Sequence, residues 1–326
     1  MRECLARIAC ILVLVLVTAT VPMSASGKLT VKLATAYPPG NEACVAAEKF
    51  AELVAAKSNG RIECQVFSGG AMGGERETLQ ALKMGSVQFV TSGMMPVHMF
   101  ATKYGFFDAP YVIKDYDHWK RVWAGPLGAQ VAALFKQNMI VPLGTYYRGV
   151  RHITANKPIK SPTDLRGIKM RVPEDPSWVK IWKQLGTLPT VVALPELFTA
   201  LQTGVADASE GPASQLISYK LNEVQKYLVM SGHMVAVGLI TANEPFIRSL
   251  SAEDREVILA AAREAAEYTD NYALQVESKL INDLLKGGMT RIEPDRQALR
   301  EAAKPAIEEL FRTEWNVTTW DEVLKQ

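Results

Sequence analysis

Hydrophobic and polar positions alternate along the chain with two different periods. Residues 29–36 and 61–67 alternate with a period of two, which is typical of strands with one buried face. Between them, the apolar positions of residues 42–58 recur every three to four residues, as on one face of a helix. A strand–helix–strand unit of this kind predicts a parallel pair joined by a right-handed crossover. Because the same order recurs further along the chain, the predicted fold class is α/β.

The longest helical pattern begins at Ser251, which can cap a helix whose first turn carries Glu253 and Asp254. No Gly or Pro occurs between Ser251 and Lys286, so we expect a helix of roughly 35 residues, or ~50 Å. A total length of 326 residues also fits two domains. Since one small domain is shorter than this helix, we expect the helix to run along both domains and brace them.

Residues 168–172 read as a short strand that Pro173 ends, since proline cannot donate to the ladder. Ile168, Met170 and Val172 share one face, and Arg171 points away from it at the carboxyl end of the strand. Ligands of open α/β sheets bind beyond the carboxyl ends of the strands. The planar guanidinium of Arg171 suits a carboxylate, sulfonate or phosphate. The alternative is an ion pair with a structural acid.

The N-terminus has the features of a secretory signal. Arg2 and Arg7 precede a wholly apolar stretch, residues 8–17, and small residues follow at 24–26. This pattern predicts a signal peptide, residues 1–26, cleaved near Ser26. The alternative, an uncleaved anchor, needs ~20 apolar residues, and this stretch is shorter. We therefore expect a soluble protein exported to the periplasm.

Composition narrows the functional classes. A net charge of +2 and the lack of a Lys/Arg run give no reason to expect a nucleic-acid partner. The four histidines show no metal-ligand spacing, and the glycine-rich residues 68–75 lack the Lys-Ser/Thr pair of a phosphate loop, so no cofactor is expected. No G-x-S-x-G nucleophile motif occurs either, and we expect no enzyme activity.

Two cysteines remain after the predicted signal segment, Cys44 and Cys64. Export permits a disulfide between them, whereas their place in amphipathic segments favours two free thiols. Both alternatives stay open at this level.

Several sequence blocks together resemble the solute-binding subunits of tripartite ATP-independent periplasmic (TRAP) transporters. The blocks are residues 67–75, 149–154, 158–173 and 200–207. The resemblance spans essentially the whole chain after the signal segment, and residues 158–173 are its most specific part. It implies a two-lobed periplasmic binding protein fold, a hinge, and closure of the lobes around a ligand. The long C-terminal helix predicted from the residue pattern would brace the two lobes.

The resemblance also implies the division of the chain and its partners. Residues 27–148 with 237–276 would form one lobe, and residues 149–236 with 277–326 the other. The expected ligand is a small organic anion, which can be a carboxylate, a dicarboxylate or a sulfonate. The expected protein partner is the membrane permease of the transporter, and the binding protein itself is expected to be a monomer.

The resemblance assigns the main ligand contact to Arg171 and a second cationic contact to Arg151. Sialic-acid-type members carry an Asn forty residues after the key Arg, where this chain has Gly211, and acidic residues where it has Gly74. Both changes remove polar side chains and argue against sialic acid. Arg148 is the next candidate for the anion site, and the remaining candidates for its walls are Ser92, Tyr147, Trp178, Phe198 and Glu210.

Two other functional classes fit the same pattern less well. A ligand-sensing periplasmic subunit of a signalling receptor would share the pocket, and permease or kinase genes nearby would distinguish the two. A secreted enzyme on the same fold would need catalytic groups that the sequence does not show.

Overall fold

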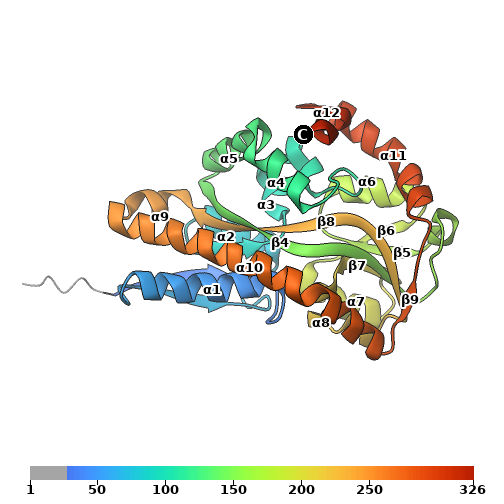
Figure 1. The fold of residues 1–326 in the computed structure, drawn as a ribbon, viewed down its shortest axis with the longest axis horizontal. Coiled ribbons are helices and arrows are strands. Elements are labelled where there is room, and N and C mark those ends of the chain that lie inside the picture. The colour runs from blue at the N-terminus through green and yellow to red at the C-terminus, as the bar shows by residue number, and fades with distance from the viewer. Residues whose placement is uncertain (1–27) are drawn as a thin grey trace, which may run out of the picture.

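The computed structural model describes residues 28–326, so the predicted signal peptide lies outside the described residues. These residues form one mixed nine-stranded sheet with the order β2-β1-β3-β8-β4-β7-β5-β6, and β9 pairs with β8 (Figure 1). The strands are β1 Leu29–Ala34, β2 Ile62–Phe67, β3 Phe89–Ser92, β4 Ile140–Ala155, β5 Lys169–Val172, β6 Leu188–Val191, β7 Ala208–Pro212, β8 Tyr227–Asn243 and β9 Thr290–Ile292.

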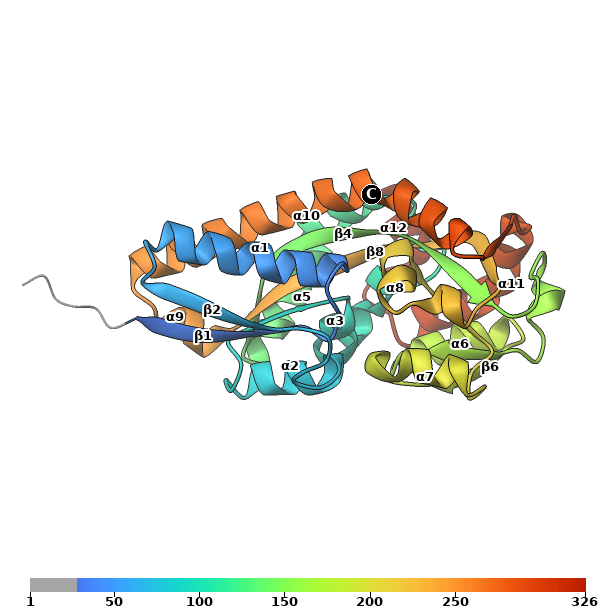
Figure 2. The same cartoon turned by 90° about the horizontal axis from the view of Figure 1, so that it is seen from below.

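Helices cover the sheet and connect its parallel strands. Figure 2 shows two halves side by side, with α1, α2 and α3 in one and α6, α7 and α8 in the other. The α-helices are α1 Glu42–Lys57, α2 Glu75–Lys83, α3 Met95–Phe100, α4 Tyr116–Ala124, α5 Pro126–Gln137, α6 Pro176–Gln184, α7 Leu197–Gln202, α8 Ala213–Ser218, α9 Glu244–Ser249, α10 Ala252–Lys286, α11 Arg296–Thr313 and α12 Trp320–Lys325. Short 3₁₀ turns are η1 Thr102–Asp108, η2 Pro162–Leu165, η3 Leu194–Glu196 and η4 Leu221–Glu223.

Two long antiparallel strands, β4 and β8, join the halves. From the sequence alone, the apolar pattern of these segments predicts two shorter strands in each place, at 140–145 and 146–154 and at 227–231 and 234–243. The structure instead pairs β4 with β8 from Ile140↔Asn243 to Ala155↔Tyr227. The register shifts at three points along the pair, and these bulges explain why the sequence reads as separate strands.

The bracing helix is confirmed. Helix α10 has 35 residues, and the Ser251 hydroxyl accepts a hydrogen bond from Asp254 N at its start. It runs along both halves in Figure 2 and packs against α1 and β4. A Cβ on Gly144 of β4 would lie 3.2 Å from Ala262 O, so glycine lets strand and helix approach closely.

Other expectations need smaller corrections. The sequence pattern predicts a short strand at 205–210, and the structure has β7 at Ala208–Pro212. Pro305 predicts a break or kink in the last long helix, and α11 continues through it to Thr313 without a break. The aromatic residues of segment 100–111 suit either a lid or the core, and the structure places Phe106 and Phe107 in the core, where they are buried and stack on each other. Cys44 and Cys64 are both free thiols.

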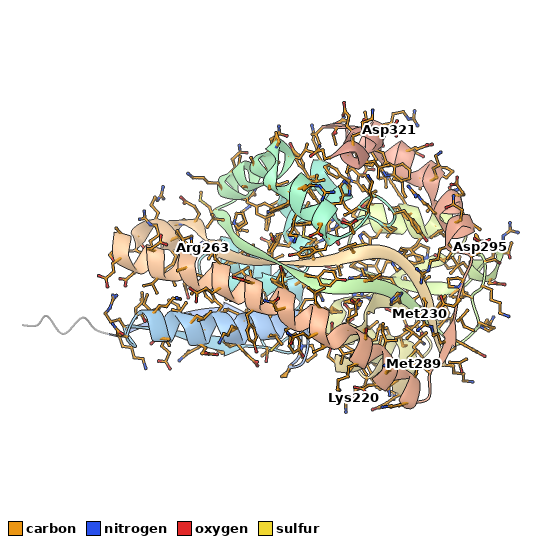
Figure 3. All side chains as sticks on the ribbon, viewed as in Figure 1. Lys220, Met230, Arg263, Met289, Asp295 and Asp321 are labelled. Carbon is orange, nitrogen blue, oxygen red and sulfur yellow. The ribbon has the colours of Figure 1, made fainter. Side chains whose placement is uncertain are left out.

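The C-terminal segment passes from one half to the other. Asp295, which caps α11, and Asp321 in α12 lie well apart along this segment in Figure 3. At its end, His118 of α4 bonds Val323 O at 2.8 Å, and Lys114 Nζ donates to Leu324 O at 2.6 Å. None of the helices in residues 28–326 is both long and apolar enough to cross a bilayer.

Candidate functional site

A small cavity of about 40 Å³ lies between the two halves, where the carboxyl end of β5 faces the β4–β8 crossover. We call it the front cavity. It brings together four of the residues that the sequence singled out, Arg148, Arg151, Arg171 and Trp178. Its other polar walls are Tyr37, Glu75, His98, Asp108 and Gln215.

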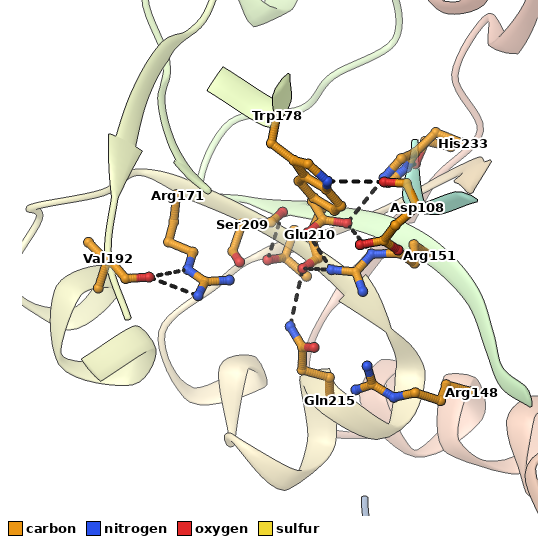
Figure 4. Close-up of polar contacts among 12 residues, drawn as sticks. Asp108, Arg148, Arg151, Arg171, Trp178, Val192, Ser209, Glu210, Gln215 and His233 are labelled. Atoms are coloured by element: carbon orange, nitrogen blue, oxygen red, sulfur yellow. Dashed lines mark hydrogen bonds and ion pairs between the residues drawn. The ribbon is translucent and has the colours of Figure 1, made fainter. Parts of the chain in front are cut away.

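Arg171 occupies the predicted position at the carboxyl end of β5. Its side chain is 4% exposed, and its Nε and Nη2 donate to the carbonyl of Val192 at 3.0 and 2.8 Å (Figure 4). Burial lowers the pKa of Arg171, although a guanidinium stays charged at neutral pH. Within residues 28–326 its Nη1 has no hydrogen-bond partner, so the outer end of the guanidinium is available to an anion.

Arg151 is held by a buried carboxylate. Its Nε and Nη2 donate to the two carboxylate oxygens of Glu210, both at 2.5 Å, and His233 Nε2 lies 3.2 Å from Oε2. Burial acts to raise the pKa of Glu210, but the charge and hydrogen bonds of Arg151, with His233, outweigh it and lower the pKa to about 2. Glu210 is fully buried and does not line the front cavity, so it positions Arg151.

Arg148 is a buried cation that has no carboxylate within ion-pair distance among residues 28–326. Burial acts to lower its pKa, but Tyr37 and Tyr146 and the more distant charges of Glu42 and Glu75 outweigh it and raise the pKa. Its Nη1 donates to the Tyr37 hydroxyl at 3.1 Å, and its guanidinium lies 4.3 Å from the centre of the Tyr37 ring. Nε and Nη2 are buried and have no partner among the described residues. Gly93 makes room for this side chain, since a Cβ there would lie 2.9 Å from Nη1.

A bulge brings Arg148 and Arg151 to the same cavity. Residues three apart in a regular strand face opposite sides of the sheet. The pairing of β4 with β8 shifts between Tyr147 and Gly149, and Gly149 has a φ of 98°. This local rotation of the strand turns both arginines to one side. Glycine is required at this conformation, which L side chains rarely adopt.

A histidine that the sequence did not mark connects the two halves across the cavity. His98 lies in α3, with ring nitrogens 2.7 Å from a carboxylate oxygen of Asp175 and 3.0 Å from one of Asp108. Burial opposes the charged imidazole, but the charge of Asp175 and the hydrogen bonds to both carboxylates raise the pKa of His98 to about 10. No spacing in the sequence relates these three residues, so only the fold could reveal the cluster.

Further contacts hold the halves together at the cavity mouth. Trp178 Nε1 donates to the Asp108 carbonyl at 3.0 Å, and Arg76 Nε lies 2.7 Å from a carboxylate oxygen of Glu174. Tyr219 also donates to Ala36 O at 3.0 Å. The described conformation is therefore a closed one.

Besides Glu210, three of the predicted wall residues do not reach the front cavity. Ser92 is buried, and its hydroxyl donates to Gly93 O. Tyr147 points toward α10, where its hydroxyl donates to Glu277 at 3.3 Å. Phe198 lies at a separate surface pocket beside Pro195. For Tyr147, regular alternation is a poor guide because the bulge of β4 between Tyr147 and Gly149 changes which face the neighbouring side chains take.

Two halves joined by crossover strands, with buried cations in a cavity between them, define a two-lobed ligand-binding protein. The chain matches the family described as bacterial extracellular solute-binding protein, family 7, over residues 33–314, and it belongs to this family. The family binds solutes outside the cytoplasm, and TRAP solute-binding proteins share the two-lobed fold.

Similar proteins support the same class. A solute-binding protein of Roseobacter denitrificans, RD1_1052, is 33% identical over 281 residues, which are 86% of each chain. Its structure with bound L-galactonate has a TM-score of 0.84 and covers 91% of this chain and 99% of that one. A TRAP periplasmic solute-binding protein of Bordetella, with density assigned to pantoate, has 31% identity and a TM-score of 0.85 over 90% of this chain and 98% of that one.

Proposed function

We propose that this protein captures a small organic anion with a carboxylate group in the front cavity and delivers it to a TRAP-type membrane permease. The observation that supports this most directly is Arg148, a buried cation with two unpaired nitrogens. A buried charge without a partner is costly, and folded proteins normally pair it. A carboxylate between Arg148 and Arg171 would supply the missing counter-charge.

Each arginine has its own role in this proposal. Arg171 binds the carboxylate with its outer nitrogens, since Val192 O already fixes its orientation. Arg148 is the second direct contact. Arg151 contributes from beside them, with its geometry preset by Glu210. The bound L-galactonate and pantoate of the two similar structures are consistent with a carboxylate ligand.

The ligand reaches the cavity by separation of the lobes. A volume of about 40 Å³ is far below the ~300 Å³ or more of typical ligand pockets, so the closed form does not admit a ligand from solvent. We place the lobes at 27–148 with 237–276, and at 149–236 with 277–326. The bulge at Gly149 lies at this boundary and supports a hinge there. Residues 320–326 reach back to α4 of the first lobe.

We place the protein in the periplasm as a monomer, after removal of residues 1–26. Mass spectrometry of exported material checks this, because an intact Met1 end or an attached acyl group would contradict it. Size-exclusion chromatography with light scattering measures the molar mass in solution and so checks the monomeric state.

A thermal-shift screen against a library of organic acids tests the ligand class. A ligand at about 100-fold over its Kd adds roughly 2.7 kcal/mol to the free energy of unfolding. We expect stabilisation by one or a few carboxylates, and a smaller radius of gyration by small-angle scattering for the liganded protein than for the open form. Stabilisation by neutral sugars alone, with none by any carboxylate, would refute the proposal.

A further inference from the structure

A second and larger cavity, of about 520 Å³, lies behind the crossover strands. We call it the back cavity. Its walls come from the segment before α4, from β4 and β8, and from α10 and α11. The residues that matter for its chemistry are Lys114, His152, Glu277, Arg296 and Arg300.

The two cavities lie on opposite faces of the same strand. Along β4, Val150 and His152 line the back cavity, and Arg151 between them lines the front cavity. This is the alternation of side chains expected along a strand. His233 lines the back cavity and also contacts Glu210, which holds Arg151. One chain of contacts therefore leads from the back cavity to the front one.

Cations dominate the rim of the back cavity. Lys114, Arg296 and Arg300 contribute three positive charges, and Glu277 is the one carboxylate among the lining residues. Beyond the lining, Glu293 lies 3.6 Å from Arg296 Nη2. Glu277 is already engaged, since it accepts from Val150 N at 2.7 Å and from the Tyr147 hydroxyl at 3.3 Å. Arg300 makes no hydrogen bond and no ion pair with any residue in 28–326, and its guanidinium lies 5.9 Å from the centre of the Trp320 ring.

His152 adds a neutral donor to the wall. Its side chain is 4% exposed, and its Nδ1 accepts a hydrogen bond from Gly232 N at 3.2 Å. Burial, with the charges of His233 and Arg296, lowers the pKa of His152 to about 3, so the ring is neutral at pH 7. Because Nδ1 accepts, the proton is on Nε2, which has no partner in the part of the chain that the structure describes.

The rest of the wall is apolar. Ile113, Val235 and Ile281 line the cavity together with the aromatic ring of Tyr111. A ligand that suits this cavity therefore has a negatively charged end for the cationic rim and an apolar body for these side chains.

We propose that the back cavity is a second binding site, which takes an organic anion with an apolar body. The anionic group binds Arg300 and Arg296 and accepts a hydrogen bond from His152 Nε2, and the body packs against Ile113, Val235 and Ile281. The walls come from both proposed lobes, with Lys114 in one and Arg300 in the other, so the occupied site spans the hinge. The site is independent of the ligand proposed for the front cavity.

Titration with 2-naphthoate, an aromatic carboxylate, tests the site in the full exported chain. Arg171→Ala serves as the parent protein, because it disables the anion contact of the front cavity. We expect one molecule of 2-naphthoate to bind this parent. Arg300→Gln in the same background should weaken binding about three- to tenfold, as expected for an ion pair at a partly exposed rim. Arg300→Lys should retain most of the affinity, because it retains the charge.

The controls decide between this site and an unspecific one. Arg312→Gln removes an exposed arginine from the same helix without touching the cavity, and it should leave binding unchanged. The affinity of the parent protein for the neutral 2-naphthamide should be no higher than the affinity of the Arg300→Gln variant for 2-naphthoate. The proposal is wrong if 2-naphthoate does not bind the parent at millimolar concentration, or if Arg300→Gln and Arg312→Gln bind it equally. It is also wrong if the amide binds as tightly as the acid.

Discussion

Two neighbouring regions of the front cavity differ in whether their buried cations have carboxylate partners. In the paired region, Arg151 is joined to Glu210 by two bonds of 2.5 Å, and His98 lies between Asp108 and Asp175. In the open region, the described residues give neither Arg148 nor Arg171 a carboxylate partner. The three arginines are buried and the side chain of His98 is only 5% exposed, so the difference lies in their counter-charges and not in their exposure.

The comparison separates scaffold from ligand contact. Pairing fixes the paired region in one geometry whether or not a ligand is present, because each charge already has its partner. In the open region, burial lowers the pKa of Arg171, and two nitrogens of Arg148 have no hydrogen-bond partner among the described residues. A bound anion removes both of these costs. A buried cation that lacks a carboxylate partner in the empty protein is therefore a candidate ligand contact, whereas a paired one belongs to the scaffold.

The largest expected effect follows from breaking the paired region. Glu210→Gln leaves Arg151 buried without its counter-charge, and the free energy of unfolding should fall by about 3–5 kcal/mol. Urea denaturation of the two proteins measures the change. Replacing both partners in Arg151→Met/Glu210→Leu should restore most of the stability, since no unpaired charge remains. A double variant as unstable as the single one would contradict this account.

Loss of Arg171 should weaken binding next most strongly. Arg171→Ala leaves the ligand carboxylate without its clamp, which costs about 2–5 kcal/mol, or roughly 30- to several-thousand-fold in Kd. Arg171→Lys should also bind poorly, because an ammonium cannot offer two parallel bonds. Calorimetry with the ligand found in the screen measures both, and circular dichroism confirms folding. If the alanine variant binds within about threefold of wild type, the anion site lies elsewhere.

The histidine of the paired region should make stability depend on pH. His98 has a raised pKa, so its contribution is complete below the unfolded value of about 6.5 and is lost as pH rises toward 10. His98→Gln should cost about 1.5–3 kcal/mol near pH 6. The difference between wild type and variant, measured by denaturation between pH 6 and pH 9.5, should shrink across this window. A difference that grows with pH would show that the imidazole is neutral.

The smallest effect has the opposite sign. Arg148→Met removes an unpaired buried charge from the empty protein, so the free energy of unfolding should rise by about 1–3 kcal/mol. The same variant should bind the ligand more weakly, because the ligand loses one of its two main cationic contacts. Denaturation without ligand and calorimetry with it measure the two changes. A destabilised empty protein would show that Arg148 belongs to the scaffold.

The pattern of apolar and polar residues was sufficient to predict those helices and strands whose signals lie within a few residues of one another. Ser251, the acidic first turn and the uninterrupted stretch to Lys286 determined α10, and the alternation before Pro173 placed Arg171 at the end of β5. Caps, helix periodicity and strand ends depend on residues within a few positions of one another, so a single sequence carries this information. The blocks that resemble TRAP solute-binding subunits indicated the two-lobed fold correctly.

Only the tertiary structure decided which arginine is paired, which is open and where the second cavity lies. The bulge at Gly149 turns Arg148 and Arg151 to the same side and sends Tyr147 to α10, against the regular alternation that the sequence suggests. Glu210 reaches Arg151 from a strand 59 residues away. The counter-charge of a buried group depends on such long-range contacts, and periodicity along the chain contains no information about them.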